Sequence, residues 1–135
     1  QTLYTELELY MESHPDFDAE SLSIEYEKLT KEYYGSQILY DENTFTEWAR
    51  KGQLYRWDYY CYKYATGLLM ASAVVHAYVD QKSLKEEDYI HFLSAGSSKY
   101  SSELLKMIQI DWDQPENIDR GFEILKQAVH EFEKV

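Results

Sequence analysis

Apolar side chains at helical spacing constrain the fold of this chain more than any other feature. Near the carboxyl end they recur in steps of four and three residues, at Ile118, Phe122, Leu125, Val129 and Phe132. At 100° per residue these steps place all five on one face of a helix. No stretch of the chain sustains the alternation of a β-strand. The sequence therefore predicts an all-α helical bundle.

The same spacing, together with capping residues, predicts the other helices. We expect six to seven in all, with one long central helix, at about residues 1–13, 21–34, 44–51, 55–81, 83–95, 101–108 and from 115 onward. Ser21 or Ser23 is the expected N-cap of the second helix, and Gly35 its end. Ser83 and Glu86 have the spacing of a capping box, and Pro115 suits a first helical turn.

Composition limits the class of protein. A length of 135 residues suits a single domain, residues 1–135. The net charge of −12 argues against nucleic acid or anionic lipid as a partner. The most apolar run, residues 64–79, is shorter than a membrane helix requires. One cysteine and no amino-terminal signal pattern favour a cytoplasmic location, and the start at Gln1 inside a helical pattern suggests a piece of a longer protein.

Familiar catalytic motifs do not occur in the chain. The four histidines never stand four apart as a zinc-ligand pair would, so no metal site is expected. His76, in an apolar run, is interpreted as a packed, hydrogen-bonded side chain, and His91 and His130 as exposed ones. Cys61 is expected to be a small core residue.

The unusual segment is YRWDYYCYKYATG, residues 55–67, which is rich in tyrosine and encloses Asp58. On one continuous helix Tyr55, Tyr59 and Tyr62 would fall within an arc of about 60°. The opposite, apolar side would hold Trp57, Cys61, Tyr64 and Leu68. Because a buried phenol requires a hydrogen-bond partner, two interpretations stay open, internal packing with bonded hydroxyls and a row that faces a ligand. Small residues downstream, such as Gly67 and Ala73, would allow close helix packing.

A family resemblance covers nearly the whole chain. WARKGQLYRWDYYCYKYATG, residues 48–67, resembles the carboxyl-terminal signature of oligoendopeptidase F and related zinc peptidases of the thimet oligopeptidase family. QTLYTELELYMES, KEYYG and FLSAGSSKYSSELLKMIQID resemble further family segments, in the same order. The resemblance implies the carboxyl-terminal part of a larger helical peptidase fold.

The implied activity is hydrolysis of short peptides in an enclosed helical channel with one zinc ion. In the family the zinc ligands and the general base precede the helix at which this chain begins, so the chain alone should bind no zinc and be inactive. The implied partners are short peptides and the amino-terminal remainder of the peptidase. An isolated part of this kind would also expose apolar surface and could self-associate.

The resemblance also implies roles for individual residues. Tyr55 and Tyr62 would donate hydrogen bonds to the transition state, and Tyr59 and Tyr60 would bind substrate. The family's substrate-binding histidine falls at or beside Gln53, where this chain has Gly-Gln in place of Pro-His. The neutral amide of glutamine donates a hydrogen bond, but unlike histidine it cannot take up a further proton or carry a positive charge. The alternative is therefore a non-catalytic helical module that binds peptides or proteins.

Overall fold

Helices account for every regular element in the computed structural model, which describes residues 1–56 and 59–134. No strand occurs in those residues, and the all-α prediction is confirmed. Contacts divide the chain into two compact units, Gln1–Ala65 and Thr66–Val135. Each unit is described by itself below. The single domain expected from length stays a prediction.

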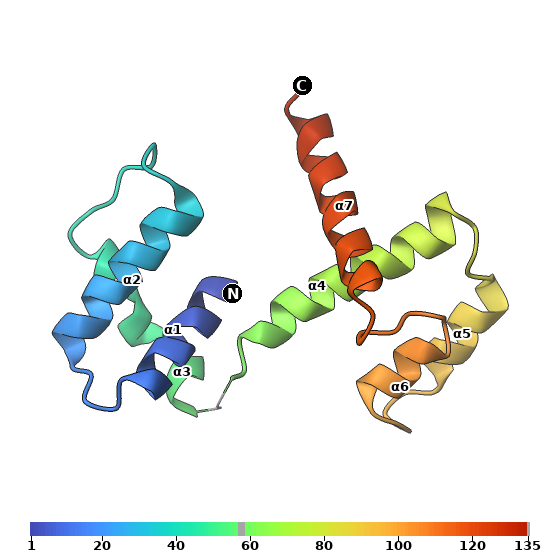
Figure 1. The fold of residues 1–135 in the computed structure, drawn as a ribbon, viewed down its shortest axis with the longest axis horizontal. Coiled ribbons are helices and arrows are strands. Elements are labelled where there is room, and N and C mark those ends of the chain that lie inside the picture. Colours follow the sequence, from blue (N-terminus) through green and yellow to red (C-terminus); the bar gives the residue numbers. More distant parts are fainter. Residues whose placement is uncertain (57–58, 135) are drawn as a thin grey trace. The chain divides into compact units, whose positions relative to one another are not determined.

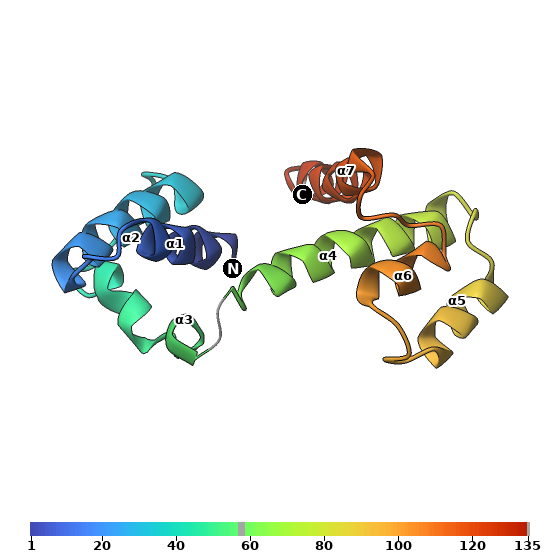
Figure 2. The ribbon, with the colours of Figure 1, turned by 60° about the horizontal axis from the view of Figure 1, so that its bottom comes forward.

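The first unit is organised around two helices that lie side by side, α1 (Thr2–Ser13) and α2 (Ala19–Tyr34) (Figures 1 and 2). Leucines and one tyrosine at helical spacing bury their side chains between them, and the fully buried Leu7 lies at the centre. The core cluster consists of Leu3, Leu7, Leu22, Tyr26 and Leu29. The two helices therefore form where the apolar spacing predicts them.

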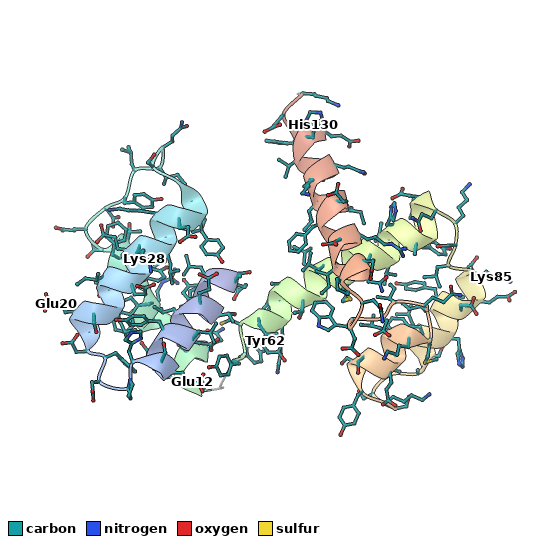
Figure 3. All side chains as sticks on the ribbon, viewed as in Figure 1. Glu12, Glu20, Lys28, Tyr62, Lys85 and His130 are labelled. Carbon is teal, nitrogen blue, oxygen red and sulfur yellow. The ribbon has the colours of Figure 1, made fainter. Side chains whose placement is uncertain are left out.

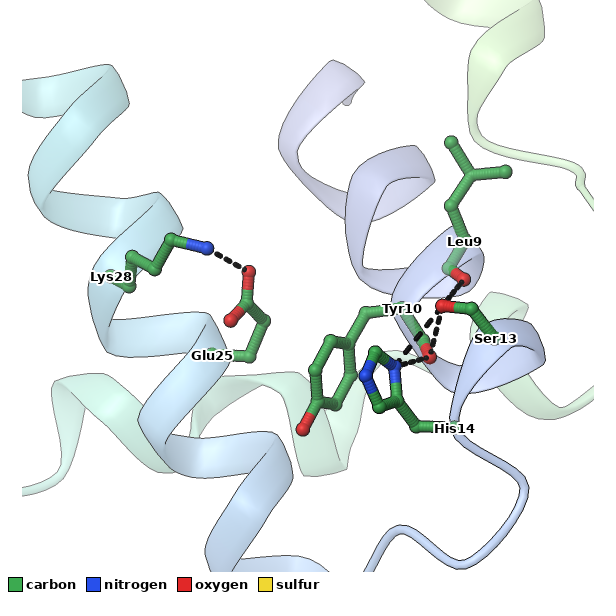
Figure 4. Close-up of polar contacts among 6 residues, drawn as sticks. All are labelled: Leu9, Tyr10, Ser13, His14, Glu25 and Lys28. Atoms are coloured by element: carbon green, nitrogen blue, oxygen red, sulfur yellow. Dashed lines mark hydrogen bonds and ion pairs between the residues drawn. The ribbon is translucent and has the colours of Figure 1, made fainter.

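Polar contacts end α1 before the proline at position 15 (Figure 4). The Ser13 hydroxyl donates to the carbonyl of Leu9 at 2.8 Å, and Nδ1 of His14 lies 2.9 Å from the carbonyl of Tyr10. The imidazole also stacks on the Tyr10 ring at 4.2 Å between centroids. The Tyr10 carbonyl also accepts from the backbone N–H of His14 at 3.0 Å, so side-chain and backbone donors together close the last turn of α1.

A capping box begins α2 earlier than expected. Asp18, not Ser21 or Ser23, is the N-cap, and its Oδ1 accepts from the backbone N–H of Ser21 at 2.8 Å. Ser21 is the reciprocal member, because its hydroxyl oxygen accepts from the N–H of Asp18. The helix ends at Gly35, as predicted, with φ of +78°, a conformation that glycine adopts at little cost. Lys28 and Glu25 pair along its exposed side (Figure 4).

Two short helices follow in the first unit. The expected helix near residues 44–51 is a 3₁₀-helix, η1 (Thr44–Arg50), and α3 (Gln53–Arg56) is a single turn. Trp48 of η1 donates from Nε1 to the Ser23 hydroxyl at 3.1 Å, and Leu54 of α3 packs against the core of α1 and α2. These two side chains fasten the segment to the unit.

The long central helix predicted for residues 55–81 is present, but it begins later than expected, at Tyr62. The helical path ends with α3 at Arg56, begins again with α4 (Tyr62–Val75) and widens into a π-helical turn, η2 (His76–Asp80). Tyr59 adopts φ of +49°, a left-handed conformation that no continuous α-helix contains. Trp57 and Asp58 lie outside the described residues.

The second unit packs three helices around α4: α5 (Glu86–Ser94), α6 (Ser101–Lys106) and α7 (Pro115–Phe132). In Figure 2 α6 lies between α4 and α5, and in Figure 1 the beginning of α7 overlaps α4. The core cluster consists of Met70, Ala73, Leu84, Ile108 and Ile110. All three helices lie at the positions that the sequence predicts.

The predicted capping box at Ser83 is wrong. The Ser83 hydroxyl donates to the carbonyl of Ala77 at 3.2 Å, and the N–H groups of Ser83 and Leu84 bond to the same carbonyl. Ser83 therefore completes the end of the preceding helix. The N-cap of α5 is Lys85, and the helix begins at Glu86.

Close helix packing involves Gly121 of α7 and the buried Ala73 of α4, whereas Gly67 of α4 takes no part in it. A methyl group at Gly121 would lie 2.8 Å from the carbonyl oxygen of Leu69, whereas one at Gly67 would meet no atom within 4 Å. Further along α7 the predicted apolar stripe is exposed, with 59% of Val129 and 81% of Phe132 accessible.

Within the described residues, no helix is both long and apolar enough to cross a membrane.

Candidate functional site

The predicted site residues occupy three consecutive pieces of the first unit. Gln53 and Tyr55 lie on α3, and Tyr59 and Tyr60 follow it in sequence. Tyr62 is the first residue of α4 (Figure 3). They are close in sequence, but they do not share one helix.

The single helical row of Tyr55, Tyr59 and Tyr62 is therefore wrong. Tyr55 and Tyr62 are exposed, at 52% and 44%, while the Tyr59 hydroxyl oxygen is buried. The expected apolar reverse side is wrong as well, because Tyr64 and Leu68 are about half exposed, at 50% and 56%. Cys61 is buried, as predicted, and Trp57 lies outside the described residues. The break between α3 and α4 causes these differences by changing the direction in which each side chain points.

A pocket of about 380 Å³ lies beside Tyr59. One face of α1 supplies Glu8, Met11 and Glu12, whose spacing of three and four residues aligns them along the helix. Leu54 of α3 and Tyr59 complete the described lining. The pocket thus combines two carboxylates, a phenol and apolar surface.

Tyr59 carries the most informative polar atom of this pocket. Its hydroxyl oxygen is buried and has no hydrogen-bond partner among the residues that the structure describes. A buried hydroxyl without a partner costs about 1–3 kcal/mol, and a left-handed backbone at a non-glycine residue adds about 1–2 kcal/mol. An unsatisfied, strained aromatic residue in a pocket is typical of a binding site.

Tyr60 makes contacts of a different kind. The Lys63 ammonium lies 4.8 Å from the centre of the Tyr60 ring, and the Tyr64 ring meets it edge to face at 5.8 Å. A hydrogen bond to Tyr60 raises the pKa of the Tyr64 phenol. Tyr60 is thereby held against the first turn of α4, and it is not among the described residues that line the pocket.

Burial, only partial for Tyr55, shifts the pKa of two groups nearby, the half-exposed Tyr55 phenol and the Cys61 thiol. It raises the pKa of the Tyr55 phenol, so Tyr55 keeps its proton and is a hydrogen-bond donor at neutral pH. Burial, and to a lesser degree the Glu8 carboxylate, also raise the pKa of the Cys61 thiol. A raised pKa keeps the thiol protonated and makes Cys61 unsuited to act as a nucleophile.

Sequence reasoning missed the contribution of α1. Glu8 of α1 is a carboxylate with only 8% of its surface exposed, and it directly follows the core residue Leu7 in sequence. A carboxylate inside an otherwise apolar helical stripe was the available signal. The direction of the Glu8 side chain toward Leu54 and Tyr59 depends on how α3 folds back, which the spacing does not reveal.

The described residues do not provide a metal site. No group of three or more histidine, cysteine, aspartate or glutamate side chains in this part of the chain could hold a metal ion. His14 bonds to the end of α1, His76 lies 2.9 Å from Asp80, and His91 and His130 are exposed, as predicted. These residues do not fit a zinc ion.

The helical fold agrees with the class of protein that the family-like sequence segments indicate, a helical peptidase. The sequence profile of Peptidase family M3 matches residues 1–124, and the chain belongs to this family. Members of the family are metallopeptidases.

Individual relatives refine this assignment. The chain is 31% identical over 140 residues to the oligopeptidase PepF of Bacillus subtilis, a match that covers 100% of the chain and 21% of the relative. It is 31% identical to an oligoendopeptidase F homolog of Borreliella burgdorferi, with 86% of the chain and 20% of that protein covered. The chain therefore spans about a fifth of the length of these curated relatives.

A solved structure gives the same result for the fold. The crystal structure of oligoendopeptidase-F from Enterococcus faecium matches 98% of this chain and 26% of its own length, with a TM-score of 0.85 and 31% identity. The predicted resemblance to oligoendopeptidase F is confirmed, and the chain corresponds to part of such a peptidase.

Proposed function

We propose that this chain supplies the substrate-binding tyrosines of an oligoendopeptidase F-like zinc peptidase that hydrolyses short peptides. The remainder of the peptidase would provide the zinc ion, its ligands and the general base. The residues of this chain would then bind and orient the peptide and donate hydrogen bonds to the reacting carbonyl. A cytoplasmic location for the enzyme stays a prediction.

Phenols suit this task because they donate a hydrogen bond without carrying a charge. Tyr55 and Tyr62 are our candidates for hydroxyls that donate to the oxyanion as it forms, and the raised pKa of Tyr55 keeps its proton in place. Tyr59, Tyr60 and Gln53 are candidates for substrate binding. A glutamine at position 53 can donate to a peptide carbonyl but cannot transfer a proton.

The Tyr59 hydroxyl is the observation that carries the proposal. It is buried at a pocket of about 380 Å³ and has no partner within the described part of the chain. A peptide carbonyl or amide that entered the pocket would satisfy it, which favours a ligand over internal packing. Leu54 and Met11 would contact the apolar part of the same peptide.

The proposal predicts that Tyr62→Phe lowers peptide turnover far more than stability. We would replace the aligned segment of Bacillus subtilis PepF with this chain and follow cleavage of a quenched fluorescent peptide. Removing one donor to an oxyanion typically lowers kcat by about 100-fold or more. Because Tyr62 is 44% exposed, loss of its hydroxyl should change the free energy of unfolding by at most about 1.5 kcal/mol, the upper end for a single hydrogen bond.

Tyr34→Phe is the matched control, since Tyr34 is an exposed tyrosine near the end of α2. It should leave both turnover and stability unchanged. If Tyr62→Phe retained full turnover in a chimera that cleaves the peptide, Tyr62 would have no part in transition-state binding.

A non-catalytic peptide-binding module is the second candidate. It is favoured by Gln53, which stands where the resemblance places a histidine. Calorimetric titration of the 135-residue chain with short peptides would support this function if binding were micromolar and the chimera failed to cleave. Self-association through the exposed stripe of α7 stays a prediction that sedimentation would test.

A further inference from the structure

A second pocket, separate from the tyrosines, lies wholly within the second unit. It has a volume of about 240 Å³ and borders the π-helical turn η2, the connection to α5, the end of α6 and the start of α7. Its base is apolar, since Ala73, Leu84, Ile108 and Ile110 belong to the core of this unit. Its polar lining consists of His76, Gln81, Ser83, Gln109, Asn117 and Arg120.

The charge of this pocket differs from that of the rest of the chain. The protein contains 25 acidic residues, yet none lies among the described residues that line the pocket. Arg120 is the cation of the lining, and its guanidinium forms no ion pair or hydrogen bond with any described residue. The nearby lysines differ, because Lys106 pairs with Asp111 and Lys126 pairs with Glu123.

Two further polar side chains of the pocket lining are held in position by hydrogen bonds. Nδ1 of His76 lies 2.9 Å from a carboxylate oxygen of Asp80, which fixes the imidazole and leaves Nε2 for another partner. Asn117 is only 9% exposed, and its Nδ2 donates to the carbonyl of Asp111 at 2.9 Å. The bond fixes the amide and leaves its second N–H for another acceptor.

The backbone at η2 determines which of its side chains line the pocket. The N–H of Gln81 bonds to the carbonyl of His76 at 2.9 Å, five residues back, in the π-helical pattern. This wider turn lies at the carboxyl end of α4, directly before the connection to α5. Here it introduces His76 and Gln81 into one pocket lining.

We propose that this pocket binds a small organic carboxylate, whose charged group pairs with Arg120 and whose carbon chain rests on the apolar base. A guanidinium matches the planar carboxylate with two parallel hydrogen bonds. The apolar base favours an organic acid over an inorganic anion, and the volume is below that of a typical drug-sized site. None of the proposed peptidase residues belongs to this pocket, so the site is independent of the proposed function.

The test is a titration of the isotopically labelled 135-residue chain with butyrate, followed by NMR. We expect saturable shifts at the Asn117 side-chain amide and the Arg120 Nε–H. Butyramide, which has the same size without the charge, should bind about tenfold more weakly or worse, equivalent to about 1.4 kcal/mol. Shifts of equal size with both compounds would overturn the proposal, as would inorganic phosphate binding as tightly as butyrate.

Arg120→Gln should weaken butyrate binding by about tenfold or more. Lys126→Gln is the control on the same helix and should leave binding unchanged, because Lys126 pairs with Glu123 and does not line the pocket. Equal affinity of the native chain and Arg120→Gln would also overturn the proposal. If Arg120→Gln did not fold, as judged by circular dichroism, the comparison of butyrate with butyramide on the native chain would decide.

Discussion

Single residues in this chain break patterns that their neighbours follow. Tyr59 lies between helical segments, yet its φ of +49° ends any continuous helix. Its sequence neighbourhood contains neither glycine nor proline, the residues that usually mark such a break. The outcome is a buried hydroxyl beside Glu8 and Leu54 in place of a surface row of phenols.

Gly121 is the residue of the second unit at which α7 approaches the backbone of α4 most closely among the glycines of the chain. We expect Gly121→Ala to lower the free energy of unfolding by about 1–3 kcal/mol, because its methyl group would lie 2.8 Å from the Leu69 carbonyl and force α7 away from α4. Urea denaturation, followed by circular dichroism, measures the free energy of unfolding of the native chain and of Gly121→Ala.

Gly67→Ala is the matched control. Its methyl group would meet no atom, and alanine should raise stability by about 1 kcal/mol in the interior of α4. Equal effects of the two substitutions would contradict the close approach of α7 to Leu69.

Helix ends explain most differences between expected and observed elements. Ser83 has the spacing of a capping box with Glu86, but its hydroxyl bonds to the carbonyl of Ala77 instead. Asp18 begins α2 three residues before Ser21, and the two then cap the helix reciprocally. Local sequence identifies residues able to cap, whereas the surrounding chain decides which free backbone group each one reaches.

Asp18 should make the stability of α2 depend on pH. Hydrogen bonds from Ser21 lower the pKa of the Asp18 carboxyl, so its contribution is present above the unfolded pKa of about 3.9 and is lost as pH falls through the lower folded pKa. Asp18→Asn keeps an acceptor for Ser21 but does not titrate.

Urea unfolding of both proteins between pH 3 and pH 7, about the range over which aspartate titrates, would test this. The native chain should lose stability relative to Asp18→Asn as the pH falls below about 4. A stability difference that stayed constant with pH would contradict the role of the carboxylate charge.

At the scale of the molecule, the division into Gln1–Ala65 and Thr66–Val135 raises the question of cooperativity. The two core clusters share no residue, yet α4 belongs to both units because it begins at Tyr62. The length of the chain predicts one domain, and this prediction can be tested through unfolding.

If the chain is one domain, Gly121→Ala in the second unit should lower protection from hydrogen exchange equally in both units. Backbone amides of Leu7 and Tyr26 report on the first core, and that of Ile108 on the second. A loss of protection confined to Ile108 would show that the units unfold independently.

The sequence by itself determined the helical class, the positions of most helices and the peptidase family. Apolar spacing and the order of the segments that resemble the family are properties of the linear chain, and the family match over residues 1–124 agrees with them. The five predicted site residues lie on short neighbouring elements because they are close in sequence.

Only the tertiary structure decided the arrangement of the candidate site. It placed the break at Tyr59, directed Glu8 and Glu12 of α1 toward the same pocket, and held His76 and Arg120 around a second one. The physical reason is that periodicity records which face of a helix is apolar. It does not record where a helix stops when packing of residues distant in sequence, such as Leu54 against the α1–α2 core, outweighs weak local preferences.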